Sequence, residues 1–159
     1  MTPTPAGVDL APLAAILARY PAEEPSLIQV LQEVQRAYRY LPCEVLAAVA
    51  EALHVPLARV VSVATFYRAF AHRPQGRLVV KVCTGTACHI RGAGLLLEAL
   101  SRRLGVRPGE TTEDLGFTLE TVNCVGACAM APVVIAGERY HGNARPARLD
   151  RILRDGDPR

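Results

Sequence analysis

Two pairs of cysteines have the residue type and spacing to do chemistry in this chain. Cys83 and Cys88 enclose Thr-Gly-Thr-Ala, and Cys124 and Cys128 enclose Val-Gly-Ala, so the spacings are C-x4-C and C-x3-C. Thiolates bind soft metal ions and iron–sulfur clusters, and each short loop returns its second sulfur toward its first. Two such loops on neighbouring strands would form a cup of four sulfurs.

Several kinds of site use four cysteines, and the spacing ranks them. Structural zinc sites more often use tight C-x2-C loops, whereas a C-x4-C loop with Gly and Thr inside is similar to the first half of the plant-type ferredoxin spacing. The spacing therefore favours an iron–sulfur cluster over zinc, with disulfides or free thiols as the remaining alternative. A redox dithiol would need a C-x-x-C, which the sequence lacks, and a Rieske site would need a second Cys and His pair.

Several other residues could be considered for the site, but none of them is expected to be a ligand. Gly85 and Gly126 lie inside the two loops, where we expect glycine to allow close approach of the backbone to the cluster. Cys43 lies outside both loops and is expected to be a packing residue. Arg91 is expected to be a solvated charge on a helix face. The histidines are scattered and none is expected to be a ligand, although His89 could tune the cluster as a neighbour: His54, His72, His89 and His141.

The elements that must position the cysteines are strands and helices of the second half. The β-branched run Leu78–Val82 predicts a strand ending at Cys83, and Phe117–Val122 predicts a second strand that ends just before Cys124. Between them, apolar residues at helical spacing predict a helix from Ile90 to Gly105 whose N-terminal end points at the site. The order of elements indicates an α/β fold with helices packed on a small mixed sheet.

The remainder of the second half predicts a hairpin and a final helix. Residues 132–136 and 139–141 read as two strands joined through Gly137 and Glu138. A last short helix carries Leu149, Ile152 and Leu153.

The first half is predicted to be a small helical bundle. Asp9 can cap a first helix that ends before Pro21, and three further helices begin near Ser26, after Pro42 and at Pro56. Residues 71–76 contain Pro and Gly and break both periodicities. We therefore expect two domains, a helical bundle over residues 1–75 and a cluster-binding domain over residues 76–159.

Composition excludes several classes of function. The chain has 159 residues and is 50% hydrophobic, enough for a real core, and its net charge of +3 is too small to indicate nucleic acid or a membrane surface as a partner. No apolar run approaches the roughly 20 residues of a membrane span, and residues 1–5 do not resemble a secretory signal, so we expect a cytoplasmic protein. The sequence shows neither a nucleotide-binding glycine motif nor a nucleophile with an obvious base, so no substrate-converting site is expected in this chain alone.

Two longer segments carry a resemblance to a known family. Residues 83–93, Cys-Thr-Gly-Thr-Ala-Cys-His-Ile-Arg-Gly-Ala, and residues 122–132, Val-Asn-Cys-Val-Gly-Ala-Cys-Ala-Met-Ala-Pro, resemble the small 2Fe-2S subunit of complex I (NADH:quinone oxidoreductase). The same module is similar to subunits of NAD(P)-linked hydrogenases and formate dehydrogenases. Residues 63–67, Val-Ala-Thr-Phe-Tyr, end the helical half as in that family, so the resemblance spans nearly the whole chain.

The resemblance implies a fold, a cofactor and a partner. It implies a helical N-terminal part followed by a thioredoxin-like domain with one 2Fe-2S cluster, an iron–sulfur metal site held by Cys83, Cys88, Cys124 and Cys128. The implied role is single-electron transfer with an FMN-bearing, NAD(H)-binding flavoprotein subunit of a larger redox complex, FMN and NAD(H) being bound by that partner.

Three alternatives to the complex I role remain open. The first is a subunit of an NAD(P)-linked hydrogenase or formate dehydrogenase, and the second is a free-standing ferredoxin. Because shuttle ferredoxins are commonly acidic and this chain is slightly basic with an additional helical half, the subunit is favoured. The third is a zinc-stabilised binding module.

Overall fold

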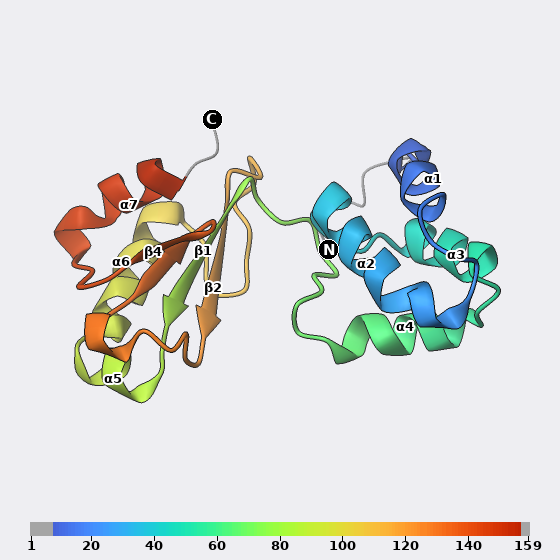
Figure 1. Ribbon diagram of the computed structural model, residues 1–159. Helices are drawn as coiled ribbons and strands as arrows, with labels where there is room; N and C mark the ends of the chain where they lie inside the picture. The colour runs from blue at the N-terminus through green and yellow to red at the C-terminus, as the bar shows by residue number, and fades with distance from the viewer. Residues whose placement is uncertain (1–7, 157–159) are drawn as a thin grey trace. The chain divides into compact units, whose positions relative to one another are not determined.

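The chain folds into two compact units, Met1–Pro74 and Gln75–Arg159, and the computed structural model describes residues 8–156 of it (Figure 1). Residues 1–5, on which the expectation about a secretory signal depends, lie outside the described residues. None of the described helices is long and apolar enough to cross a membrane.

The first unit is a bundle of α-helices, as predicted. Its helices are α1 (Ala11–Leu17), α2 (Leu27–Tyr38), α3 (Cys43–Ala52) and α4 (Leu57–Phe66), and a short 3-10 turn, η1 (Glu24–Ser26), leads into α2. Helix starts follow the predicted signals. The Asp9 carboxylate accepts a hydrogen bond from the backbone N–H of Ala11 at 2.9 Å, and a proline directly precedes both α3 and α4.

The core of this unit comes from the apolar face of each helix. Fully buried valines and leucines lie on α2 and α3, and Val60 and Ala64 supply the contribution of α4. Cys43, the first residue of α3, is exposed, so the prediction that it packs in the core is wrong. It opens a helix whose buried face begins only two residues later, at Val45.

The second unit contains a four-stranded mixed sheet in the order β2-β1-β3-β4, which confirms the predicted α/β class. Strands β1 (Leu78–Cys83) and β2 (Phe117–Val122) are parallel, with Cys83 opposite Val122 at their carboxyl ends. Strands β3 (Val134–Ala136) and β4 (Arg139–His141) form the predicted hairpin, and β3 runs antiparallel to β1.

Two longer helices pack on this sheet. Helix α6 (Ala93–Leu104) contacts β1 and β2, and α7 (Leu149–Gly156) contacts β3. An ion pair between Arg103 and Asp150 joins α6 to α7, so the two helices lie side by side. The three apolar residues predicted for the last helix are all buried, which confirms that prediction.

The single helix predicted from Ile90 to Gly105 is in fact two helices. Helix α5 (Thr86–Ile90) comes first, the chain turns at Gly92 with a φ of 90°, and α6 then begins. Ile90 matches the apolar spacing of α6 but is 78% exposed, because it belongs to α5. The prediction of one long helix with its N-terminal end at the site is therefore wrong, and Cys88 lies within α5 instead.

The outer edge of β2 is partly covered by the segment that precedes it. The Gly109 N–H donates to the Leu119 carbonyl oxygen at 2.7 Å, and the Leu119 N–H donates to the Glu110 carbonyl oxygen at 3.0 Å. A bridge between Thr111 and Thr118 continues this pairing. Residues 109–112 thus act as a short additional strand along the first half of β2.

Candidate metal centre

The first thiol pair begins where β1 ends. Cys83 is the last residue of β1, Cys88 lies in α5, and both residues are only 2% exposed. The Thr84 N–H donates to the Val122 carbonyl oxygen at 2.8 Å, which fixes the start of the loop against the end of β2. Because β1 and β2 are parallel neighbours, the loops that follow them emerge at the same edge of the sheet.

The second thiol pair lies in the loop after β2. The sulfurs of Cys124 and Cys128 are 3.9 Å apart, and both residues are exposed. A tetrahedral metal with metal–sulfur bonds of about 2.3 Å places two of its thiolates about 3.8 Å apart, so this separation suits shared ligation of one metal atom. The Gly126 N–H donates to the Cys124 sulfur at 3.4 Å, the kind of backbone hydrogen bond that supports a ligating thiolate.

The two pairs are close enough to influence each other. Burial raises the pKa of the Cys88 thiol, a hydrogen bond with Cys83 raises it further, and a backbone hydrogen bond from Val133 acts in the opposite direction. The pKa of Cys128 is raised first by its hydrogen bond with Cys124, and the charge of Cys83 adds to the effect. Since the thiolate is the ligand form, a metal or cluster that binds here must displace protons.

The donor set fits a two-iron cluster. Within residues 8–156, no three cysteine, histidine or carboxylate side chains converge as the ligands of a single metal ion. The thiols instead form two neighbouring pairs, one in the loop after β1 and one in the loop after β2. Two cysteines for each of two irons is the requirement of a 2Fe-2S cluster, whereas structural zinc gathers four ligands around one ion.

The two loop glycines have different structural roles. A Cβ atom on Gly85 would overlap the carbonyl oxygen of Asn123 and lie 3.3 Å from the Cβ of Cys124, so Gly85 allows the two ligand loops to touch. Gly126 has no protein atom within 4 Å of a Cβ placed on it, but its φ is 76°. Glycine is therefore suited to position 126 by its left-handed backbone and not by crowding from the protein.

Arg91 is a residue whose role the sequence did not indicate. The residue is exposed, as a solvated charge should be, but its Nη1 also donates to the carbonyl oxygen of Ala131 at 3.2 Å. The two residues are 40 positions apart in the chain, and no spacing rule connects them. His89 is exposed, and nothing in the structure gives it a role at the site.

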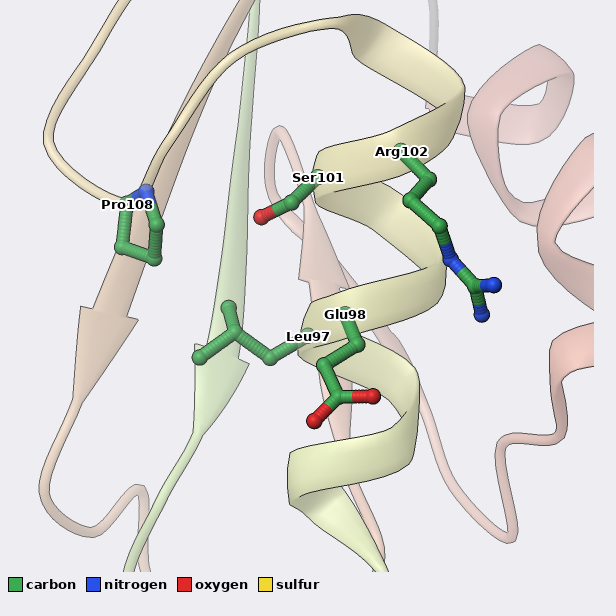
Figure 2. A pocket seen from close by; sticks show the side chains of 5 residues that line it. All are labelled: Leu97, Glu98, Ser101, Arg102 and Pro108. Carbon is green, nitrogen blue, oxygen red and sulfur yellow. The ribbon is translucent and has the colours of Figure 1, made fainter.

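A shallow hollow lies away from the thiols. It has a volume of about 430 Å³ and lies between α6 and the loop that follows it. Figure 2 shows that Leu97 and Ser101 extend from α6 toward Pro108, whereas Arg102 extends to the other side of the helix. None of the cysteines lines this hollow.

Comparisons with known proteins identify the family of the chain. The family model described as thioredoxin-like 2Fe-2S ferredoxin matches residues 13–157. The chain is 41% identical over 133 residues to the NADP-reducing hydrogenase subunit HndA of Solidesulfovibrio fructosivorans, covering 84% of this chain and 78% of that protein. It is 43% identical over 141 residues to an NADH-quinone oxidoreductase subunit of Rhizobium meliloti (strain 1021), covering 89% of this chain and 84% of that protein.

A solved structure shares the fold. An NAD+-reducing NiFe hydrogenase in the air-oxidized state aligns with a TM-score of 0.70 and 23% sequence identity. The alignment covers 85% of this chain but only 23% of the hydrogenase chain. At this identity the likeness concerns the fold alone.

Proposed function

This chain belongs to the thioredoxin-like 2Fe-2S ferredoxin family, and we propose that Cys83, Cys88, Cys124 and Cys128 hold its cluster. The chain is an electron-transfer subunit of a multi-subunit NAD(P)-linked oxidoreductase. When bound, a 2Fe-2S cluster takes up and releases one electron at a time. The observation that carries the ligand assignment is the meeting of two thiol pairs at the shared end of β1 and β2.

The two thiol pairs offer different environments. Cys83 and Cys88 are buried against the core of the unit, which keeps water from that side of the site. Cys124 and Cys128 are exposed, and so is Met130 beside them, at 42%. Electrons would therefore enter and leave through the face formed by the loop after β2, where a partner can approach most closely.

The proposed partner is a flavoprotein subunit that carries FMN and binds NAD(H). Its support is that the relatives are named as subunits of an NADP-reducing hydrogenase and of an NADH-quinone oxidoreductase. The exposed apolar side chains of Ile90 and Met130 flank the ligand loops, and their burial by a partner would stabilise a complex.

We place this assembly in the cytoplasm, at most peripheral to a membrane complex.

Two parent complexes are supported about equally. The identities of 41% to the hydrogenase subunit and 43% to the quinone oxidoreductase subunit are too close to separate them. We propose a role in complex I or, as the alternative, in an NAD(P)-linked hydrogenase or formate dehydrogenase. In either case we propose that the reaction of the nicotinamide takes place on the partner and not on this chain.

The test mixes the purified chain with NADH, first alone and then with the flavoprotein subunit. We expect the visible absorbance to remain that of the oxidised cluster with NADH alone and to bleach once the flavoprotein is present. Iron and sulfide analysis of the same sample checks for two of each per chain, the composition of a 2Fe-2S cluster. Direct reduction by NADH without flavin would contradict the proposed partner, and a colourless protein containing zinc would contradict the proposed cluster.

A further inference from the structure

Arg91 connects the two segments that carry the proposed ligands. It is the first residue after α5 and lies one helical turn beyond Cys88. Its Nη1 donates to the carbonyl oxygen of Ala131 at 3.2 Å. The Ala131 N–H in turn donates to the carbonyl oxygen of Cys128 at 3.2 Å. A continuous series of bonds therefore runs from the segment of Cys88 to the segment of Cys128.

This link lies at a different end of the site from the other contacts between the loops. Near Cys83, the loops are held by the paired strands, by the Thr84 hydrogen bonds to Val122, and by the contact of Gly85 with Asn123. Those contacts fix where both loops begin. The Arg91 bond is formed where α5 ends and the second loop returns to the core.

The partner atom of Arg91 is buried. Ala131 is only 1% exposed, so its carbonyl oxygen is shielded from water and the guanidinium of Arg91, itself exposed, supplies its hydrogen bond. Arginine carries a positive charge, and the bond holds that charge at the end of the helix that contains Cys88.

We propose that Arg91 is a positioning residue for the cluster: its guanidinium holds the Cys88 and Cys128 segments together and favours the reduced state. The inference rests on the proposed ligand set. Reduction adds a negative charge to the site, and a nearby cation stabilises the reduced form relative to the oxidised form. Groups that orient ligands in this way commonly change metal affinity by tenfold or more when they are removed.

The test compares Arg91→Ala and Arg91→Lys with the control Arg102→Ala in the full cluster-loaded chain. Arg102 carries the same charge but lies near the far end of α6, about 13 Å along the helix axis from Ala93, the first residue of α6. It is one of the residues that line the hollow of Figure 2. Three quantities are measured: the reduction potential, the rate of cluster loss to an iron chelator, and the thermal unfolding temperature.

We expect Arg91→Ala to lose its cluster about tenfold faster than the wild type. We also expect its ratio of reduced to oxidised cluster at a given potential to fall by up to about tenfold, which corresponds to a shift of about −59 mV. Arg91→Lys should recover most of the potential, because it retains the charge, while remaining more sensitive to the chelator, because it lacks the planar fork. Arg102→Ala should match the wild type in reduction potential and in the rate of cluster loss.

Three results would overturn the inference. The first is an Arg91→Ala variant with the potential and cluster-loss rate of the wild type, and the second is one in which only the unfolding temperature falls. The third is an Arg102→Ala variant that reproduces the Arg91→Ala shifts. The proposed function is tested separately by the wild type, since a wild-type chain without iron and sulfide would contradict that proposal, whatever the variants do.

Discussion

The α-carbon of Gly85 lies against the backbone carbonyl of Asn123, so the two ligand loops meet with no room for a side chain at position 85. A Cβ atom at position 85 would also lie 3.3 Å from the Cβ of Cys124. The relative position of the two thiol pairs therefore depends on a residue that is not itself a ligand.

Replacing Gly85 by alanine should impair the cluster although all the thiols remain. The added methyl group must displace backbone, and overpacking of this kind typically costs about 1–3 kcal/mol. We expect lower iron and sulfide content and faster bleaching of the visible absorbance. Gly94→Ala is the matched control, because Gly94 lies in α6 with no atom within 4 Å of an added Cβ, and alanine favours a helix. Equal cluster content in both variants would contradict the role of Gly85.

The effect of a substitution at Gly126 on the cluster should depend on whether the new residue tolerates a positive φ, and not on the volume of its side chain. The φ of 76° strains a β-branched residue, so Gly126→Val should destabilise the loop by about 1–2 kcal/mol and shift the absorbance spectrum. Gly126→Asn adds a similar volume but tolerates this conformation, and it should retain most of the cluster. If both variants behave alike, the left-handed backbone is not what selects glycine here.

Each of the proposed ligands should be needed for a stable cluster. We expect serine at position 83, 88, 124 or 128 to remove the cluster or destabilise it severely, because each thiol has one neighbouring partner in its pair. Cys43→Ser should leave the visible absorbance unchanged, since Cys43 is exposed in the other unit. A bleached Cys43→Ser variant alongside a fully coloured loop variant would refute the ligand assignment.

The turn before β2 should weaken in acid. Hydrogen bonds from the Thr112 hydroxyl and from the Gly116 N–H lower the pKa of the Asp114 carboxyl. A lowered folded-state pKa stabilises the turn above the ordinary carboxyl pKa of about 3.9, and this stabilisation is lost as pH falls through the lowered value. Hydrogen-exchange protection of the Gly116 amide should therefore decrease between about pH 5 and about pH 2. Asp114→Asn should remove that dependence, and unchanged protection in the wild type would contradict it.

We propose that the two compact units are separate domains, and core truncations should separate their stabilities. Leu31 in α2 and Leu119 in β2 are both fully buried, so Leu31→Ala and Leu119→Ala should each cost about 2–5 kcal/mol. Thermal loss of the cluster absorbance should move to lower temperature only for Leu119→Ala, while the far-ultraviolet signal should report both. A matching shift of the absorbance transition in Leu31→Ala would show that the units unfold as one.

The sequence predicted the elements that have a strong local signal. The β-branched run ending at Cys83, the hairpin around Gly137 and the amphipathic last helix are present as expected, because each pattern has the period of its element. The thiol loops were also identified from local sequence, because the two cysteines of each pair are close together in the chain.

Features that depend on long-range contacts were not predictable. The break at Gly92 was missed because Ile90 fits the apolar spacing of α6, and only the left-handed turn assigns it to another helix. The hydrogen bond of Arg91 to Ala131 and the contact of Gly85 with Asn123 each join residues about 40 positions apart, and they exist only once β1 and β2 are paired. Local patterns contain no information about such contacts.

The covering of β2 by residues 109–112 has a consequence for the chain before its cluster is inserted. An open strand edge is a template on which another chain can add a strand, and this is a common route to aggregation. Because Gly109 and Glu110 already use the outward hydrogen-bonding groups of Leu119, the first half of that edge is closed to a second chain. The opposite edge is β4, which is only 3 residues long and exposes Arg139, so it too is a poor template. Before the cluster is inserted, the sheet therefore offers a second chain no long open edge on which to add a strand.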